Sequence, residues 1–166
     1  MDTDKINLPS EDLEEEAMYF VDRKKIGSVL SYMEELLDLY GKKEKWEGPV
    51  EELALERLAH NVIECIIDIG NAMIDGFIMR DPGSYEDILD ILLDERVITE
   101  EMHGPLIRVI KIRALLVREF ASADHEVITW TLSDAFESLN QFSPAVRTYL
   151  TDELGPVSAF SPEQSE

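Results

Sequence analysis

The chain has 166 residues, of which 45% are hydrophobic and 8% aromatic, so it can close one sizeable core but hardly a second. Its net charge of −21 repels nucleic acid at long range, and any RNA site must therefore be a local basic surface. No apolar run approaches the ~20 residues of a membrane helix, and the first residues lack the basic and apolar regions of a signal peptide. We expect a cytoplasmic protein.

The acidic charge is concentrated at both ends of the chain. Residues 1–17 contain seven acidic residues against Lys5, and residues 152–166 contain four acidic residues and no basic one. Both stretches lack helical apolar periodicity, and the second is interrupted by glycine, serine and proline. We therefore predict a disordered acidic extension over 1–17, one domain over 18–151 and a disordered acidic tail over 152–166.

Between these ends, apolar residues recur at helical spacing and no stretch alternates as a strand does, so we predict an all-α fold. Short loops between the helices favour an antiparallel bundle. The first predicted helix follows a cap at Asp22 and ends before Gly41, and the second runs from Gly48-Pro49 to about Phe77. Gly70 lies in the apolar arc of the second helix, where the missing side chain lets another segment come close.

The second half of the chain contains shorter predicted helices. Ser84-Tyr-Glu-Asp87 resembles a capping box, and Thr99 has the character of the next cap. Because Gly104-Pro105 interrupts a continuous helix, we predict a turn over 100–103 and a fresh helix from Pro105 to about Phe120.

Two further helices are predicted after Phe120. Asp124 is expected to cap the first of them, and Ser143-Pro144 is expected to cap a last short helix. The last helix would then place Val146 and Leu150 in the core.

Several kinds of site are excluded by counting. The eight glycines never cluster into a phosphate-binding loop, and Glu100-x-x-His103 is a single pair where a di-iron bundle needs two. We expect no metal and no cofactor. His60 and Glu64, four residues apart, indicate a partly exposed helix pair. Cys65 lies in an apolar run and indicates a buried thiol.

The predicted helix from Pro105 to Phe120 carries an arginine in an unusual place. At 100° per residue, Arg113 falls at the centre of one apolar arc. A buried and unpaired guanidinium would cost several kcal/mol, so Arg113 needs a carboxylate, a set of carbonyls or a water-filled cleft. A structural ion pair and a functional cleft arginine both remain open. The arc consists of Leu106, Val109, Ile110, Leu116, Val117 and Phe120.

The opposite side of the same predicted helix is the one basic island on this acidic chain. Arg108, Lys111 and Arg118 share it with a single acid, Glu119. Together with Arg113, these three residues are the candidate RNA-binding residues.

Four segments, spread in order along the chain, together form a recognisable pattern. They are Met18-Tyr-Phe-Val-Asp-Arg-Lys-Lys-Ile26, Asp68-Ile-Gly-Asn-Ala-Met-Ile74, Ser84-Tyr-Glu-Asp-Ile-Leu89, and Arg113-Ala-Leu-Leu-Val-Arg-Glu-Phe120 followed by Asp124. These segments resemble the HepT-like branch of the HEPN superfamily, and within it an uncharacterised group of bacillus-type cytosolic proteins. The resemblance covers about residues 18–150 and implies that Met18 corresponds to the usual start of the family.

The resemblance implies a HEPN-type bundle and a ribonuclease activity. Active members are metal-independent ribonucleases of type VII toxin–antitoxin modules, in which two copies face each other across a homodimer cleft. Their motif is an arginine, four to six residues, a histidine, one residue and a tyrosine. The histidine transfers protons and the arginine stabilises the charge that develops on the phosphate. A nucleotidyltransferase antitoxin silences the toxin by modifying the tyrosine.

This chain departs from the family motif. The arginine matches Arg113, but Ala114 replaces the usual asparagine, Arg118 stands at the histidine position and Phe120 at the tyrosine position. A guanidinium stays protonated near neutral pH and cannot act as a general base. In another register, Arg118 and His125 have the required spacing, although a cap at Asp124 puts His125 in the first turn of the next helix.

Three classes of function therefore stay open. The first is a catalytically degenerate HEPN protein that dimerises and binds RNA or a partner, such as a nucleotidyltransferase-type antitoxin. The second is an active or weak metal-independent ribonuclease toxin, and the third is an unrelated helical adaptor. We predict a homodimer whose interface includes the helix from Pro105 to Phe120, because Ile107, Ile112 and Leu115 make that helix apolar on several sides.

Overall fold

The computed structural model describes the backbone of residues 11–155 and the side chains of residues 23–155. Within this part of the chain every regular element is a helix, which confirms the all-α prediction. The helices are α1 (Glu11–Lys42), α2 (Pro49–Gly76), α3 (Tyr85–Asp94), α4 (Glu100–Lys111), α5 (Arg113–Arg118) and α6 (His125–Leu154).

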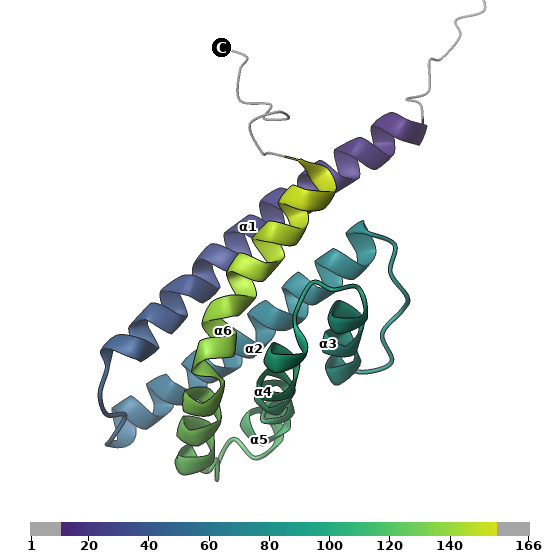
Figure 1. Cartoon of the computed structure of the whole chain (residues 1–166). Helices are drawn as coiled ribbons and strands as arrows, with labels where there is room; N and C mark the ends of the chain where they lie inside the picture. The colour runs from purple at the N-terminus through teal and green to yellow at the C-terminus, as the bar shows by residue number, and fades with distance from the viewer. Residues whose placement is uncertain (1–10, 156–166) are drawn as a thin grey trace, which may run out of the picture.

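Three long helices form the body of the bundle, and the shorter helices cover one side of it. Figure 1 shows α1 and α6 side by side, with α2 behind α6 and with α3, α4 and α5 on the side away from α1. α6 packs against α1, α2 and α4, and α2 packs against α1, α3, α5 and α6, so these two helices together form the centre of the bundle. The short connection between α1 and α2 makes these two helices antiparallel, as predicted. α6 is also antiparallel to α1 but runs in the same general direction as α2 (Figure 1).

A single hydrophobic core runs along the inner faces of these helices. Leu30, Met33, Ile63, Ile66 and Phe142 are among its fully buried side chains. The buried apolar residues of α1, α2 and α3 form much of this core, with Val29, Phe77 and Leu93 at its margin. Cys65 is buried as predicted, and its desolvation raises the pKa of the thiol to about 11.

The crossing of α2 and α3 depends on Gly70. A Cβ atom at this position would overlap Cγ2 of Ile88 on α3. The sequence predicted such a close approach without naming the helix that makes it. Gly70 is therefore a packing residue that lets α3 lie directly on α2.

Three predicted N-caps are confirmed. The hydroxyl of Ser84 accepts a hydrogen bond from the backbone N–H of Asp87, and Thr99 Oγ1 accepts from Met102. The carboxylate of Asp124 accepts from the N–H groups of Glu126 and Val127. Each cap satisfies N–H groups that have no partner inside their own helix.

The start predicted for the first helix is wrong. α1 begins at Glu11 and passes through Asp22, which was the predicted cap. Residues 11–21 contain no glycine or proline and several strong helix formers, so local propensity extends the helix where apolar periodicity fails. At the other end α6 reaches Leu154, and Gly155 follows with a φ of 80°. Residues 1–10 and 156–166 of the predicted tails lie outside the described residues.

The two predicted interruptions at proline are also wrong. α4 starts at Glu100 and continues through Pro105, and α6 continues through Pro144. Gly104 has no Cβ to collide with the proline ring, which removes part of the usual bias against helix before proline. In α6 the flanking Phe142 and Val146 are both buried, so packing on both sides of Pro144 holds the helix together.

None of the described helices is both long enough and apolar enough to cross a membrane.

Candidate functional site

Arg113 lies at the junction of two short helices and is held by two neighbours. α4 ends at Lys111, Ile112 forms the link, and Arg113 is the first residue of α5. Its Nε donates a hydrogen bond of 2.8 Å to Oε1 of Glu64 on α2, and its guanidinium lies 4.6 Å from the ring centre of Tyr85. The side chain is 27% exposed. The hydrogen bond to Glu64 raises the pKa of Arg113, so its positive charge is secure.

The helix break changes the predicted surroundings of Arg113. Leu106, Val109, Ile110 and Leu116 are buried as expected from a single apolar arc, but Val117 and Phe120 are exposed. The arc assumed one continuous helix, and the change of direction at Ile112 turns the last part of it outward. Arg113 therefore lies at the edge of the core, with an acid on one side and a ring on the other.

The predicted His60–Glu64 pair on α2 lies beside Arg113, and we call His60, Glu64, Arg113 and Tyr85 the Glu64 cluster. His60 Nε2 lies 3.4 Å from Oε1 of Glu64, the oxygen that also accepts the hydrogen bond from Arg113. Both side chains are partly exposed, in agreement with the helix pair inferred from the sequence. One carboxylate thus stands between an imidazole and a guanidinium on the outer side of the α2–α5 contact.

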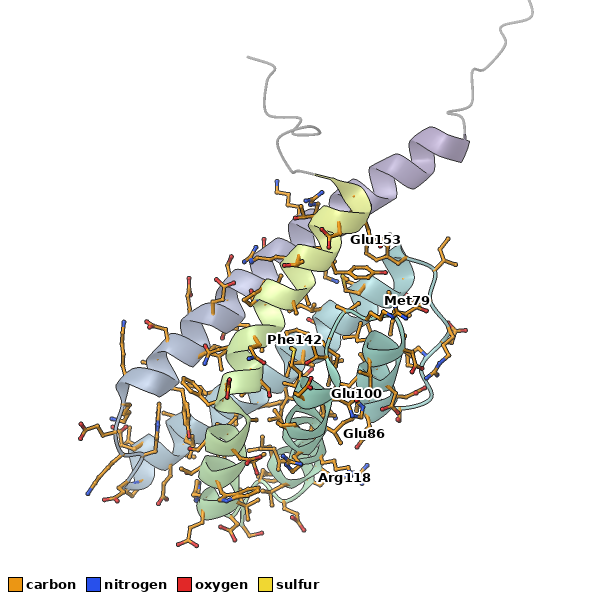
Figure 2. The ribbon with its side chains drawn as sticks, viewed as in Figure 1. Met79, Glu86, Glu100, Arg118, Phe142 and Glu153 are labelled. Atoms are coloured by element: carbon orange, nitrogen blue, oxygen red, sulfur yellow. The ribbon has the colours of Figure 1, made fainter. Side chains whose placement is uncertain are left out.

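The other two motif positions project into solvent. Arg118 is the exposed last residue of α5, and Figure 2 labels it near the lower end of the molecule. Phe120 follows in the turn after α5 with 72% of its surface exposed, an unusual value for an unpaired phenylalanine. Neither residue is part of the Glu64 cluster.

The basic island is only partly free. Arg108 makes hydrogen bonds of 3.3 and 2.8 Å from Nε and Nη2 to Asp134 on α6, so its charge is largely matched. Lys111 and Arg118 are exposed, and Arg113 is paired with Glu64. The sequence prediction missed the acids because Glu64 and Asp134 lie on other helices, at separations that no local pattern encodes.

His125 lies in the first turn of α6, as predicted from the cap at Asp124. It is the first residue of α6, with Nδ1 3.8 Å from a carboxylate oxygen of Glu52 and Nε2 3.2 Å from one of Glu56. It also borders an open groove between the α1–α2 connection and α6, where Trp46 and Trp130 contribute aromatic surface. His125 is therefore separated from the Glu64 cluster and faces carboxylates of its own.

Sequence reasoning did not find Tyr85 or assign Glu64 to Arg113. Tyr85 was part of the Ser84 capping pattern, and nothing in that pattern indicated that its ring would lie against a guanidinium. The charge requirement of Arg113 did indicate that a carboxylate or other acceptor must be near. In the folded bundle this carboxylate is that of Glu64, one helical turn after His60 on α2.

A comparison with protein families gives one match that covers most of the chain. Residues 28–146 match the family described as Ribonuclease HepT-like. The Bacillus subtilis (strain 168) protein named "Putative RNase YutE" is 48% identical over 143 residues, which cover 86% of this chain and 99% of that protein. An unrelated helical adaptor is thereby excluded.

Solved structures agree with the family match. A structure of YutE from Bacillus subtilis, described as a cytosolic protein of unknown function, superposes with a TM-score of 0.81 and covers 86% of this chain and 99% of its own. A tri-AMPylated Shewanella oneidensis HEPN toxin in complex with MNT antitoxin is 15% identical with a TM-score of 0.59, covering 79% of this chain and 97% of its own. The latter similarity concerns the fold alone. Because the family model matches residues 28–146 and the Bacillus subtilis protein is 48% identical over most of both chains, this chain belongs to the HepT-like ribonuclease family.

Proposed function

We propose that this chain is a HepT-like HEPN protein with a degenerate catalytic motif, which dimerises and binds RNA. The observation that carries the proposal is the surface formed by α5 and the turn after it. Arg118 and Phe120 project to solvent at the positions where the resemblance places a catalytic histidine and tyrosine. Their side chains can contact a ligand, but they cannot transfer the protons that the motif transfers.

The chemistry of the two side chains supports this distinction. Arg118 attracts a phosphate through its permanent charge and hydrogen-bond donors, and for the same reason it accepts no proton. Phe120 has no hydroxyl, so it offers a stacking surface in place of the tyrosine oxygen. Arg113 and Lys111 add positive charge on neighbouring turns. The proposed role of these residues is to hold the RNA backbone in a dimer cleft.

Exposed apolar side chains near α5 support dimerisation. The segment from Arg113 to His125 runs along α2, because Arg113 contacts Glu64 and His125 contacts Glu52 and Glu56. Val117 and Phe120 belong to this segment, and Leu53 on the adjoining part of α2 is 66% exposed. Large apolar groups that gather on one face of a soluble domain are typical of an interface. A second copy of the chain would cover them.

The dimer is tested by light scattering at micromolar concentration. The wild type is expected to scatter as a dimer, and Phe120→Asp or Leu53→Asp is expected to give monomers, because a buried unpaired carboxylate is costly. Leu39→Asp on α1 is the matched control, since Leu39 is also an exposed leucine but lies on a helix that packs mainly against α2 and α6. A monomeric wild type would remove the composite cleft.

RNA binding is tested with a fluorescent single-stranded oligonucleotide at low and physiological salt. Arg118→Ala and Lys111→Ala are each expected to weaken binding and to reduce its salt dependence by about one ion. Asp134→Ala frees Arg108 and is expected to strengthen binding. Binding that is equal in all variants would contradict the proposed surface.

The degeneracy of the motif is tested by restoring it. The double variant Arg118→His with Phe120→Tyr places an arginine, a histidine and a tyrosine at family spacing. It is expected to cleave RNA faster than the wild type in the presence of a chelator, and the gain should be lost when Arg113→Ala is added. Strong cleavage by the wild type that disappears in His125→Ala would instead identify the Arg118 to His125 register as the active one.

A nucleotidyltransferase-type antitoxin is the proposed protein partner. Two solved structures with a similar fold support it, since they are described as a toxin–antitoxin with AMP-PNP and as a HEPN toxin in complex with MNT antitoxin. Because Phe120 has no hydroxyl, such a partner would bind this chain without modifying that position. Co-purification with a nucleotidyltransferase, without added mass on this chain, is the expected result. Nucleotidylated chain in the mass spectrum would contradict it.

A further inference from the structure

Three polar side chains meet where α5 begins to cross α2. Oε1 of Glu64 accepts a hydrogen bond of 2.8 Å from Arg113 Nε and lies 3.4 Å from His60 Nε2. The side chains of His60 and Glu64 are 29% and 40% exposed, so the cluster is open to a ligand. The ring of Tyr85 lies against the guanidinium of Arg113 and limits its orientation.

Only one of the three histidines has this combination of neighbours. His103 lies 2.6 Å from Asp90 and His125 lies beside Glu52 and Glu56, but His60 shares a carboxylate oxygen with an arginine. All three histidines lie in the part of the chain whose side chains are described. His60 is therefore the histidine whose carboxylate partner is also held by a permanently charged guanidinium.

We propose that His60, Glu64 and Arg113 form a catalytic centre for RNA cleavage that does not depend on the family motif. The inference rests on the proposed function in one respect, since an RNA phosphate must reach Arg113. In this centre His60 on α2 is the proton acceptor, a role that the guanidinium of Arg118 cannot fill. The substrate class is single-stranded RNA with a free ribose 2′-hydroxyl, which serves as the internal nucleophile.

The reaction is an internal phosphoryl transfer. The 2′-oxygen of the ribose attacks the adjacent phosphorus, so the O2′–P bond forms and the P–O5′ bond breaks. The imidazole of His60 takes the proton of the 2′-hydroxyl, and the departing 5′-oxygen takes a proton from water. The imidazolium of His60 then returns its proton to the hydroxide that this water leaves. The products are a 2′,3′-cyclic phosphate and a 5′-hydroxyl, and no metal, oxidant, water or other co-reactant is consumed.

Each of the other two residues has a distinct part in this step. The carboxylate of Glu64 stabilises the imidazolium that forms when His60 takes the proton, so Glu64 is a positioning residue. Arg113 contacts Glu64 through Nε, and its two Nη groups can meet the non-bridging phosphate oxygens as charge develops on them. The same ion pair therefore fixes both the base and the phosphate-binding group.

The test uses the full-length protein and a 5′-labelled RNA oligonucleotide in buffer with excess EDTA. The wild type is expected to give 2′,3′-cyclic phosphate ends, and His60→Ala is expected to slow cleavage by on the order of 100-fold. Free imidazole added to the His60→Ala reaction should restore part of the rate, which a merely structural histidine would not show. Glu64→Gln should lower the rate and change the pH profile, because it keeps the shape of the side chain without its charge.

The matched control is His103→Ala, which removes a histidine of similar exposure and its carboxylate contact at the α3–α4 boundary. It should cleave at the wild-type rate. A wild type without cyclic phosphate products, or a His60→Ala rate equal to that of the wild type, would overturn the inference. A loss as large in His103→Ala would do the same.

Binding to a 2′-O-methyl version of the oligonucleotide separates this inference from the proposed function. That oligonucleotide keeps the phosphates and bases but has no 2′-hydroxyl to attack with. If the protein binds it and still fails to cleave RNA, the catalytic centre is wrong and the RNA-binding function stands. If neither RNA is bound, the proposed function fails as well. Binding together with His60-dependent cleavage supports both.

Discussion

The two halves of α2 share one apolar period but have different outer faces. In the second half Ile66, Ile69, Gly70 and Met73 are buried, and α3 lies directly on the glycine. In the first half the inner face is equally buried, but Leu53 is exposed on the outer face. Apolar periodicity therefore determines which residues of α2 enter the core. Whether the outer face of α2 is buried or exposed depends on the helix that packs against it.

The covering helix differs because α5 is much shorter than a continuous helix from Pro105 would have been. α5 spans Arg113–Arg118, and its contact with α2 includes the ion pair of Arg113 with Glu64. The second half of α2 is thus adapted to stability, and the first half carries the surfaces of the proposed dimer and RNA site. Changes of equal size should therefore act differently in the two halves.

The largest expected difference is between two truncations on α2. Ile66→Ala should reduce the free energy of unfolding by about 2–5 kcal/mol, because Ile66 is fully buried and its removal leaves a cavity. Leu53→Ala should cost less than about 0.5 kcal/mol within one subunit, since that side chain is mostly solvated. Urea denaturation at low protein concentration measures both. Equal losses of unfolding free energy would show that Leu53 is packed as tightly as Ile66.

A second pair of substitutions tests the α2–α3 contact. Gly70→Ala should destabilise the protein by about 1–3 kcal/mol, because the new methyl group overlaps Ile88. Gly27→Ala on α1 is the control, since its Cβ would meet nothing within 4 Å, and there the higher helix propensity of alanine should stabilise by up to ~1 kcal/mol. Thermal melting distinguishes the two signs. A neutral Gly70→Ala would mean that α3 can shift away from α2 at little cost.

The same contrast explains how far sequence reasoning reached. Much of the core, the caps at Ser84, Thr99 and Asp124, and the close approach at Gly70 follow from local patterns and were predicted, whereas buried residues such as Leu55 and Phe142 were not. The helix through Pro105 was not, because the absent Cβ of Gly104 and the packing of the completed bundle outweigh the cost of the proline. The ends of helices depend on small free-energy differences, so the start at Glu11 was also missed.

The candidate site was predictable only in part. The need of Arg113 for a partner follows from its place among apolar residues, but the choice of Glu64 depends on how α5 crosses α2. The exposure of Phe120 follows from the break at Ile112, and no residue pattern before that point predicts the break. Contacts between distant helices are set by tertiary packing, which local periodicity does not encode.

Acid should loosen the α3 side of the molecule first. Hydrogen bonds from Arg80 and from the backbone N–H of Gly83 lower the pKa of Asp87 from 3.8 to about 2. The folded state therefore favours the carboxylate, and this contribution is complete well above pH 3.8 and is lost as the pH falls towards 2. Asp87→Asn should make the melting temperature depend less steeply on pH in that window. The control Asp75→Asn, on α2, should leave the steepness unchanged, and an equal effect would contradict the assignment.

The smallest expected effect is that of salt, where two contributions oppose each other. Ions weaken surface pairs such as Lys42 with Asp38, but each exposed pair contributes little to stability. Ions also screen the mutual repulsion of a chain with a net charge of −21, and that repulsion acts over the whole surface. Raising sodium chloride from about 10 to 150 mM shortens the screening length from ~30 to ~8 Å.

The repulsion should outweigh the lost pairs, so the melting temperature should rise by roughly 2–4 °C over that range. The rise should be smaller when residues 1–10 are removed, because that deletion takes away acidic charge and leaves α1 intact. Sodium chloride is preferred to sulfate, since sulfate also strengthens apolar burial. A melting temperature that falls with salt would mean that the ion pairs, including Arg113 with Glu64, stabilise the protein by more than the repulsion between its acidic residues destabilises it. The packing of α5 on α2 would then depend on the ion pair of Arg113 with Glu64, which also belongs to the proposed site.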